Sequence, residues 1–105
     1  MYTVVNQLSV KADWADRIER AFLEHLDLLE ATPGFKGFRF LKALSPDEAP
    51  CLVEVSWADE AAFDGWKQSE HFRVSHASMG QYREAFYAPP KSGRYAVSRD
   101  IPLKN

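Results

Sequence analysis

The stretch that decides the fold is residues 2–10, which read YTVVNQLSV. Alternate side chains, starting from Tyr2 and Val4, place a mainly apolar set on one face, and this period of two is typical of a β-strand. Asn6 interrupts that face with an amide at a position where Val or Ile would be expected. The sequence therefore predicts an opening strand with one polar misfit on its apolar side.

After this strand the period becomes helical. Over residues 13–31 the apolar side chains recur at three- and four-residue spacing, which predicts one amphipathic helix with Asp13 available to cap its first turn. Thr32-Pro33-Gly34 ends the helix, because Pro cannot continue the hydrogen bonding and Gly lets the chain turn. The apolar stripe of this helix consists of Trp14, Ile18, Phe22, Leu26 and Leu29.

Two further strands are expected, over 35–41 and 51–57. In the first, Phe38 and Phe40 share one face and Phe35 lies on the other. The turn residues at 45–48 predict that the two strands form an antiparallel hairpin.

The second half of the chain repeats the helix–strand order. A helical period begins at Asp59, and Ser69 is a new cap, so two helical pieces are expected to meet near residue 69. We expect a loop over 87–93 and a fourth strand over 94–101. The order β-α-β-β-α-β predicts a single α+β domain, residues 1–105, with a ferredoxin-like four-stranded antiparallel sheet.

Several strands carry apolar side chains on both faces, as Val4 and Val5 illustrate. The helices of one chain can cover one face of the sheet, so the other face needs a partner. We therefore expect a homodimer in which two sheets pack together into an α+β barrel.

Composition excludes several classes of protein. The chain has 105 residues, 15 acidic and 13 basic, and a formal net charge of -2, which argues against a nucleic-acid partner. No apolar run approaches the about 20 residues of a membrane span, so no membrane partner is expected. The single Cys51 cannot form an internal disulfide, and the first residues are typical of a strand rather than of a secretion leader. A cytoplasmic location is expected.

Familiar catalytic motifs are absent, which leaves three residues that could carry chemistry. Asn6 is the strand misfit, His76 lies among apolar neighbours on the last helical piece, and Trp66 comes from the piece before it. Each has an ordinary interpretation taken singly: a strand-end amide, a hydrogen-bonded helix residue and a core aromatic. The fold could nevertheless bring all three to one pocket between the helices and the sheet.

Together these residues resemble the Asn/Trp/His signature of the IsdG-type haem-degrading monooxygenases, within the wider antibiotic-biosynthesis-monooxygenase superfamily. The resemblance spans nearly the whole chain, including the turn at 32–35 and the strand end at 55–57. It implies a catalytic set in which His76 is the proximal ligand of the haem iron, Asn6 donates its amide to the ligand on the iron, and Trp66 presses against the porphyrin and distorts it. Haem would be both substrate and cofactor. An external donor, a reductase or a small reductant, would supply electrons for O2-dependent ring opening with iron release.

Two alternatives remain open. Superfamily relatives oxidise flat aromatic polyketides or quinones without a cofactor, and a pocket lined by Phe22, Phe63 and Trp66 would suit such a substrate as well as haem. The chain could also bind haem without degrading it. His71 is expected at the surface. His25 could border a pocket, although packing is its ordinary interpretation, and Arg73 and Arg83 could meet the haem propionates, although arginine is common on helix surfaces.

Overall fold

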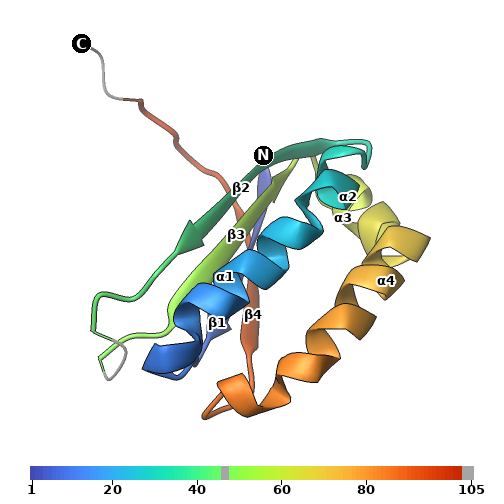
Figure 1. Ribbon diagram of the computed structural model, residues 1–105. Helices are drawn as coiled ribbons and strands as arrows, with labels where there is room; N and C mark the ends of the chain where they lie inside the picture. Colours follow the sequence, from blue (N-terminus) through green and yellow to red (C-terminus); the bar gives the residue numbers. More distant parts are fainter. Residues whose placement is uncertain (46–47, 103–105) are drawn as a thin grey trace.

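Residues 1–45 and 48–102, which the computed structural model describes, form one four-stranded antiparallel sheet in the order β2-β3-β1-β4, with helices on one face (Figure 1). The strands are β1 (Tyr2–Leu8), β2 (Phe35–Leu41), β3 (Cys51–Trp57) and β4 (Lys91–Ala96). The α-helices are α1 (Ala15–Glu24), α2 (Leu26–Glu30), α3 (Glu60–Lys67) and α4 (Glu70–Met79), with 3-10 turns η1 (Ala12–Trp14) and η2 (Gly80–Ala85). The α+β ferredoxin-like prediction is confirmed.

The central strand β1 places its predicted apolar face toward the helices. Val4 and Leu8 are buried, and Asn6 lies between them on the same face. The strand is shorter than predicted because the Val10 N–H donates to the carbonyl of Leu8 and folds the chain out of the ladder. Val10 keeps only an isolated bridge to Phe86.

The first helical region is divided rather than continuous, which corrects the prediction of one helix over 13–31. His25 has φ -112° and ψ 12°, so α1 ends before it and α2 begins after it. Asp13 lies inside the 3-10 turn η1, and no side chain caps η1 or α1, so the predicted Asp13 cap is wrong.

Strand β2 has the predicted bounds, but Phe35 faces the helices rather than the opposite side. The pairing with β3 shifts between Phe35 and Gly37, and this irregularity reverses the alternation of side chains. The Phe35 ring consequently lies 5.9 Å from the ring of Trp57, in the core. Of the predicted turn at 45–48, positions 46 and 47 lie outside the described residues, and the Glu48 N–H donates to the Ser45 carbonyl at 2.8 Å.

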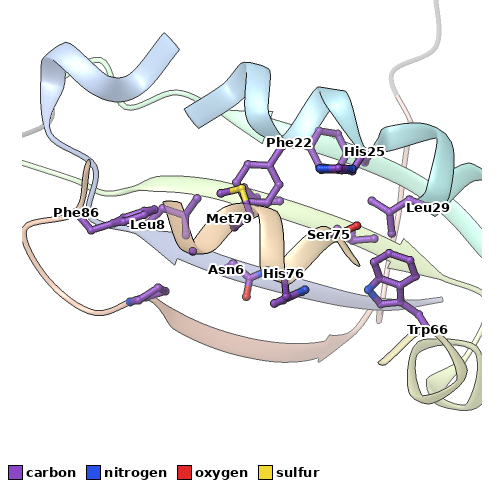
Figure 2. Close-up of a pocket in the computed structure, with 15 residues that line it drawn as sticks. Asn6, Leu8, Phe22, His25, Leu29, Trp66, Ser75, His76, Met79 and Phe86 are labelled. Carbon is purple, nitrogen blue, oxygen red and sulfur yellow. The ribbon is translucent and has the colours of Figure 1, made fainter. Parts of the chain in front are cut away.

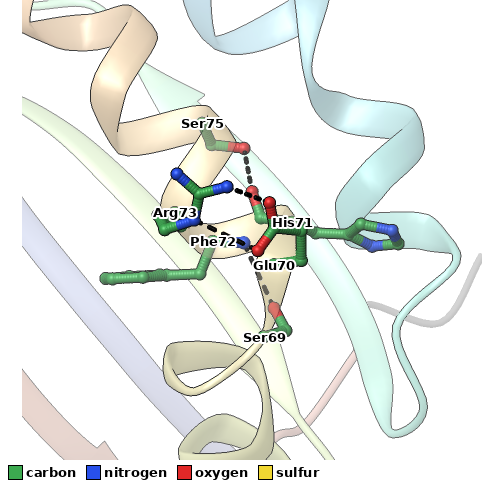
Figure 3. A network of polar contacts seen from close by, with 6 residues as sticks. All are labelled: Ser69, Glu70, His71, Phe72, Arg73 and Ser75. Atoms are coloured by element: carbon green, nitrogen blue, oxygen red, sulfur yellow. Dashed lines mark hydrogen bonds and ion pairs between the residues drawn. The ribbon is translucent and has the colours of Figure 1, made fainter.

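The two-piece helix after β3 is confirmed, and side chains cap both pieces. Asp59 accepts from the Ala62 N–H at 2.9 Å, and Ser69 accepts from the Phe72 N–H at 3.1 Å. Figure 3 shows Ser69 at the start of α4, just after the end of α3. The Ser69 cap, which was predicted from the sequence, therefore fixes the break between the two helices.

The last strand lies earlier in the chain than predicted. It pairs with β1 from Lys91 to Ala96, so residues 91–93 are strand rather than loop and residues 97–101 are not. The ladder ends because its partner begins at Tyr2, which pairs with Ala96. Residues 97–102 run away from the body of the molecule (Figure 1).

The core between sheet and helices consists of two clusters of buried residues. One contains Ile18 and Val53, and the other contains Trp57 and Trp66. Phe38 and Val55 pack against both clusters and connect them. Within the described part of the chain, no helix is both long enough and apolar enough to cross a membrane.

Candidate functional site

A pocket of about 380 Å³ opens where the two core clusters meet, with lining residues from α1, α4 and the sheet (Figure 2). Most of the lining is apolar, with a small number of polar side chains, which is the usual make-up of a small-molecule site. The lining comprises Asn6, Leu8, Phe22, His25, Leu29, Phe38, Val53, Val55, Trp66, Ser75, His76, Met79, Gly80, Phe86 and Pro90.

The structure brings most of the predicted site residues to this one pocket. Asn6, Trp66, His76 and Phe22 all line it. Phe63 does not line the pocket; its ring lies 5.7 Å from that of Tyr2 and packs in the second cluster. The sequence pattern could not separate these two phenylalanines, because both lie on apolar helix faces.

Asn6 reaches the pocket because β1 is the strand between β3 and β4. Its backbone pairs with Val53 on one side and Ser92 on the other, which fixes the direction of its side chain. Within residues 1–45 and 48–102 the Asn6 amide makes no side-chain hydrogen bond. Asn6 is half-buried and lines the pocket, so its unpaired amide is available to a ligand.

His76 is held in a defined orientation on α4 although it is exposed. Its Nδ1 lies 3.1 Å from the carbonyl oxygen of Phe72, one turn earlier, and its ring lies 3.8 Å from the Phe72 ring. Because a carbonyl can only accept, Nδ1 carries the proton and donates. The other ring nitrogen, Nε2, then keeps its lone pair for a metal or a proton donor.

Trp66 closes one end of the pocket and ties it to the core. It is 7% exposed, and its ring lies 6.1 Å from that of Trp57 and 5.7 Å from that of Phe72. Phe72 in turn packs against His76, so aromatic contacts run without interruption from the buried sheet to the exposed imidazole. Trp66 and His76 are therefore connected through their ring contacts with Phe72.

Two polar residues of the pocket, His25 and Ser75, were not among the predicted site residues. His25 lines it, and its Nε2 is buried without a hydrogen-bond partner. The sequence carries little signal for this role, because a histidine near an apolar helix stripe more often packs. Ser75 also lines the pocket, but its hydroxyl already donates to the His71 carbonyl at 2.9 Å.

The charged side chains near His76 belong to a more open groove. Lys67, Glu70 and Arg73 line it, and His76 lies where this groove and the main pocket approach each other. Arg73 and Glu70 form an exposed ion pair (Figure 3), and the Arg73 hydrogen bond lowers the pKa of the Glu70 carboxyl. Arg73 is therefore already paired in this structure.

Taken together, the pocket presents flat apolar walls, one free amide and two imidazoles with an available nitrogen. This combination suits a large aromatic ligand that carries a few polar groups. Over the described ranges 1–45 and 48–102, no three His, Cys, Asp or Glu side chains cluster as they would to hold a bare metal ion.

Comparison with known proteins connects this architecture to oxygenases. The family model described as Antibiotic biosynthesis monooxygenase matches residues 1–78. A curated heme oxygenase (mycobilin-producing) of Mycobacterium tuberculosis is 29% identical over 62 residues, 59% of this chain and 58% of that relative. The match thus spans less than two thirds of the relative's length.

Solved structures of two kinds of oxygenase share the fold. The heme-degrader MhuD of Mycobacterium tuberculosis, with two hemes bound in its active site, is similar with a TM-score of 0.73 and 21% identity, over 97% of this chain and 100% of that chain. A mutant of SnoaB, a cofactor-independent oxygenase from Streptomyces nogalater, has a TM-score of 0.77 and 18% identity, over 97% of each chain. At these identities the likeness establishes the fold and leaves the substrate open.

Proposed function

The chain belongs to the antibiotic biosynthesis monooxygenase family, and on this basis we propose that it is a haem-degrading monooxygenase. Its substrate would be haem, and its reaction the O2-dependent opening of the porphyrin ring with release of iron. The curated heme oxygenase relative supports this assignment, as does the pocket that Asn6, Trp66 and His76 line together.

One observation carries the proposal, namely the hydrogen bond between His76 Nδ1 and the Phe72 carbonyl. It selects the tautomer that a histidine needs in order to bind iron through Nε2, and the contact with Phe72 holds the ring. Bound haem would bring its own porphyrin nitrogens as iron ligands, so the protein would need to supply only one imidazole. His76 is therefore the iron ligand in this proposal.

The remaining pocket residues fit the same substrate. Trp66 offers a rigid indole face, and Phe22 an aromatic ring, to a flat macrocycle. Asn6 offers an amide N–H, which suits a position where negative charge develops during oxygen activation. Bound haem would supply the iron that activates O2 and the carbon that is oxidised, with electrons from an external donor.

We also propose that two chains associate through the sheet faces that no helix covers. In the described part of the chain the helices lie on one side of the sheet (Figure 1). The other face carries the Arg39–Glu54 ion pair together with half-buried Val5 and Leu52. Sedimentation of the wild type as a dimer, and of a Val5→Glu variant as a monomer, is the expected result. Wild-type protein that sediments as a single chain at micromolar concentration would contradict the pairing.

The first experiment is an absorbance titration with haemin of the wild type, His76→Ala and His71→Ala. We expect a saturable Soret band in the wild type, its loss or displacement in His76→Ala, and no change in His71→Ala, because His71 is exposed on the same helix and does not line the pocket. Reductant in air should then bleach the band and release iron to a chelator. A wild type without a saturable Soret change is not a haem enzyme.

A second variant separates degradation from simple haem binding. Asn6→Ala should keep the Soret titration and lose most of the bleaching, because the amide would act in the reaction rather than in iron ligation. If the wild type binds haemin but never bleaches it under reductant and O2, the protein is a haem carrier.

The cofactor-free oxygenase is the second candidate, since the pocket walls are aromatic and the SnoaB mutant shares the fold. Flat phenolic polyketides would then be consumed in air without added haem or reductant. In that reaction His76 has no necessary role, so His76→Ala would retain activity.

A further inference from the structure

His25 holds an unused hydrogen-bonding atom inside the pocket. Three buried side-chain nitrogen or oxygen atoms lack a partner in the part of the chain that the structure describes, on Tyr2, His25 and Trp57. Of these residues only His25 lines the pocket. All three atoms are shielded from solvent, and the His25 Nε2 alone among them belongs to a side chain of the pocket lining, so it is the one that a ligand in the pocket could satisfy.

The backbone conformation at His25 also sets this residue apart from the rest of its helical region. The helix between β1 and β2 breaks at this residue, with no Pro or Gly to cause the break. The break leaves the imidazole at the α1–α2 junction, while His76 comes from α4 (Figure 2). The two imidazoles thus belong to different helical walls of one pocket.

From this geometry we propose that His25 is a specificity-determining residue that donates a hydrogen bond through Nε2 to a carboxylate on the edge of the bound ring system. The inference rests on the proposed haem substrate. At its periphery haem carries methyl and vinyl groups, which cannot pair with an imidazole, and two propionate carboxylates, which can. With its proton on Nε2, His25 would be a buried donor without a partner, and such a donor gains most from a charged acceptor; His25 would then favour a ligand that presents a carboxylate toward α1 and α2.

The test compares haemin with its dimethyl ester, in which both carboxylates are esterified. Dissociation constants from Soret titrations are measured for the wild type, His25→Leu and His25→Gln. Circular dichroism confirms that each variant is folded. His25→Leu should weaken haemin binding about tenfold or more and change ester binding by less than threefold. His25→Gln keeps an N–H donor and should retain most of the wild-type preference for haemin.

The spectrum and a control variant separate this role from others. The Soret maximum of bound haemin should stay unchanged in His25→Leu, because the iron ligand is elsewhere, and His71→Leu should leave both dissociation constants unchanged. Equal losses for haemin and ester in His25→Leu, or no loss for either, overturn the carboxylate contact and leave the haem proposal standing. Wild-type protein that binds neither compound overturns both.

Discussion

Ser69 is expected to contribute far more stability than its small size suggests. Its hydroxyl oxygen accepts from the Phe72 N–H at 3.1 Å and donates to the carbonyl of Trp66 at 2.6 Å, so one side chain joins the end of α3 to the start of α4. Loss of a helix N-cap typically costs about 1 kcal/mol. A further hydrogen bond contributes about 0.5–1.5 kcal/mol. Ser69→Ala should therefore lower the free energy of unfolding by about 2 kcal/mol.

Two further variants divide this total. Ser69→Asp keeps the acceptor for the Phe72 N–H but cannot donate to Trp66, so about half of the loss should remain. Ser75→Ala is the matched control, because it removes one exposed bond to the His71 carbonyl inside α4. Alanine is the better helix former, and that variant should stay within about 0.5 kcal/mol of the wild type.

Urea denaturation followed by circular dichroism, at one fixed protein concentration, measures all of these values. The concentration must be constant because association would add its own contribution to the apparent stability. If Ser69→Ala loses no more stability than Ser75→Ala, the hydroxyl does not hold the junction. A Ser69→Asp variant as unstable as Ser69→Ala would show that the N-cap bond contributes nothing, and the division between two bonds would fail.

The remaining predictions follow from other single contacts. Gly34→Ala should lower stability by more than about 1–2 kcal/mol in urea denaturation, since φ is 85° and the new Cβ would collide with the Cβ of Ala62; an unchanged midpoint would contradict this. His25→Leu should raise the melting temperature of the ligand-free protein by a few degrees, because an unpartnered buried nitrogen costs about 1–3 kcal/mol; a marked fall in calorimetry would show that His25 serves packing. The lowered pKa of Glu70 comes from its partner Arg73, so that contribution to stability is present above the ordinary carboxyl pKa and is lost as pH falls through the lowered one. Arg73→Gln should return the NMR titration of Glu70 to its ordinary range.

The strands of the central hairpin could be predicted to the residue, and the last strand could not. Residues 35–41 and 51–57 alternate clearly and flank turn residues, so local pattern and pairing agree. The segment 91–96 contains mostly exposed polar and small side chains, and its bounds depend on where β1 begins. When the bounds of a strand depend on its partner and not on its own alternation, they are difficult to predict from the sequence.

Two further errors also come from tertiary structure. The irregular pairing between Phe35 and Gly37 reverses the face of Phe35, and no turn or breaker residue besides the glycine announces it. The helix break at His25 likewise has no Pro or Gly to predict it. Both deviations place an aromatic or imidazole ring on the helix side of the sheet, where the core and the pocket need it.

The candidate site could be found from sequence where a polar residue conflicts with its pattern. Asn6 stands out because the strand around it is apolar, and the structure shows its amide without a side-chain partner among the described residues. His25 conflicts with its surroundings just as strongly, since its Nε2 is buried and unpaired, yet a helix tolerates a histidine at its edge without disturbing the periodicity. A polar residue on the apolar face of a strand breaks a period of two and is easily recognised. A polar residue at the edge of a helical apolar stripe leaves the helical period intact and is easily overlooked. The residues of this pocket that remain to be tested should therefore be sought on its helical walls rather than on its sheet.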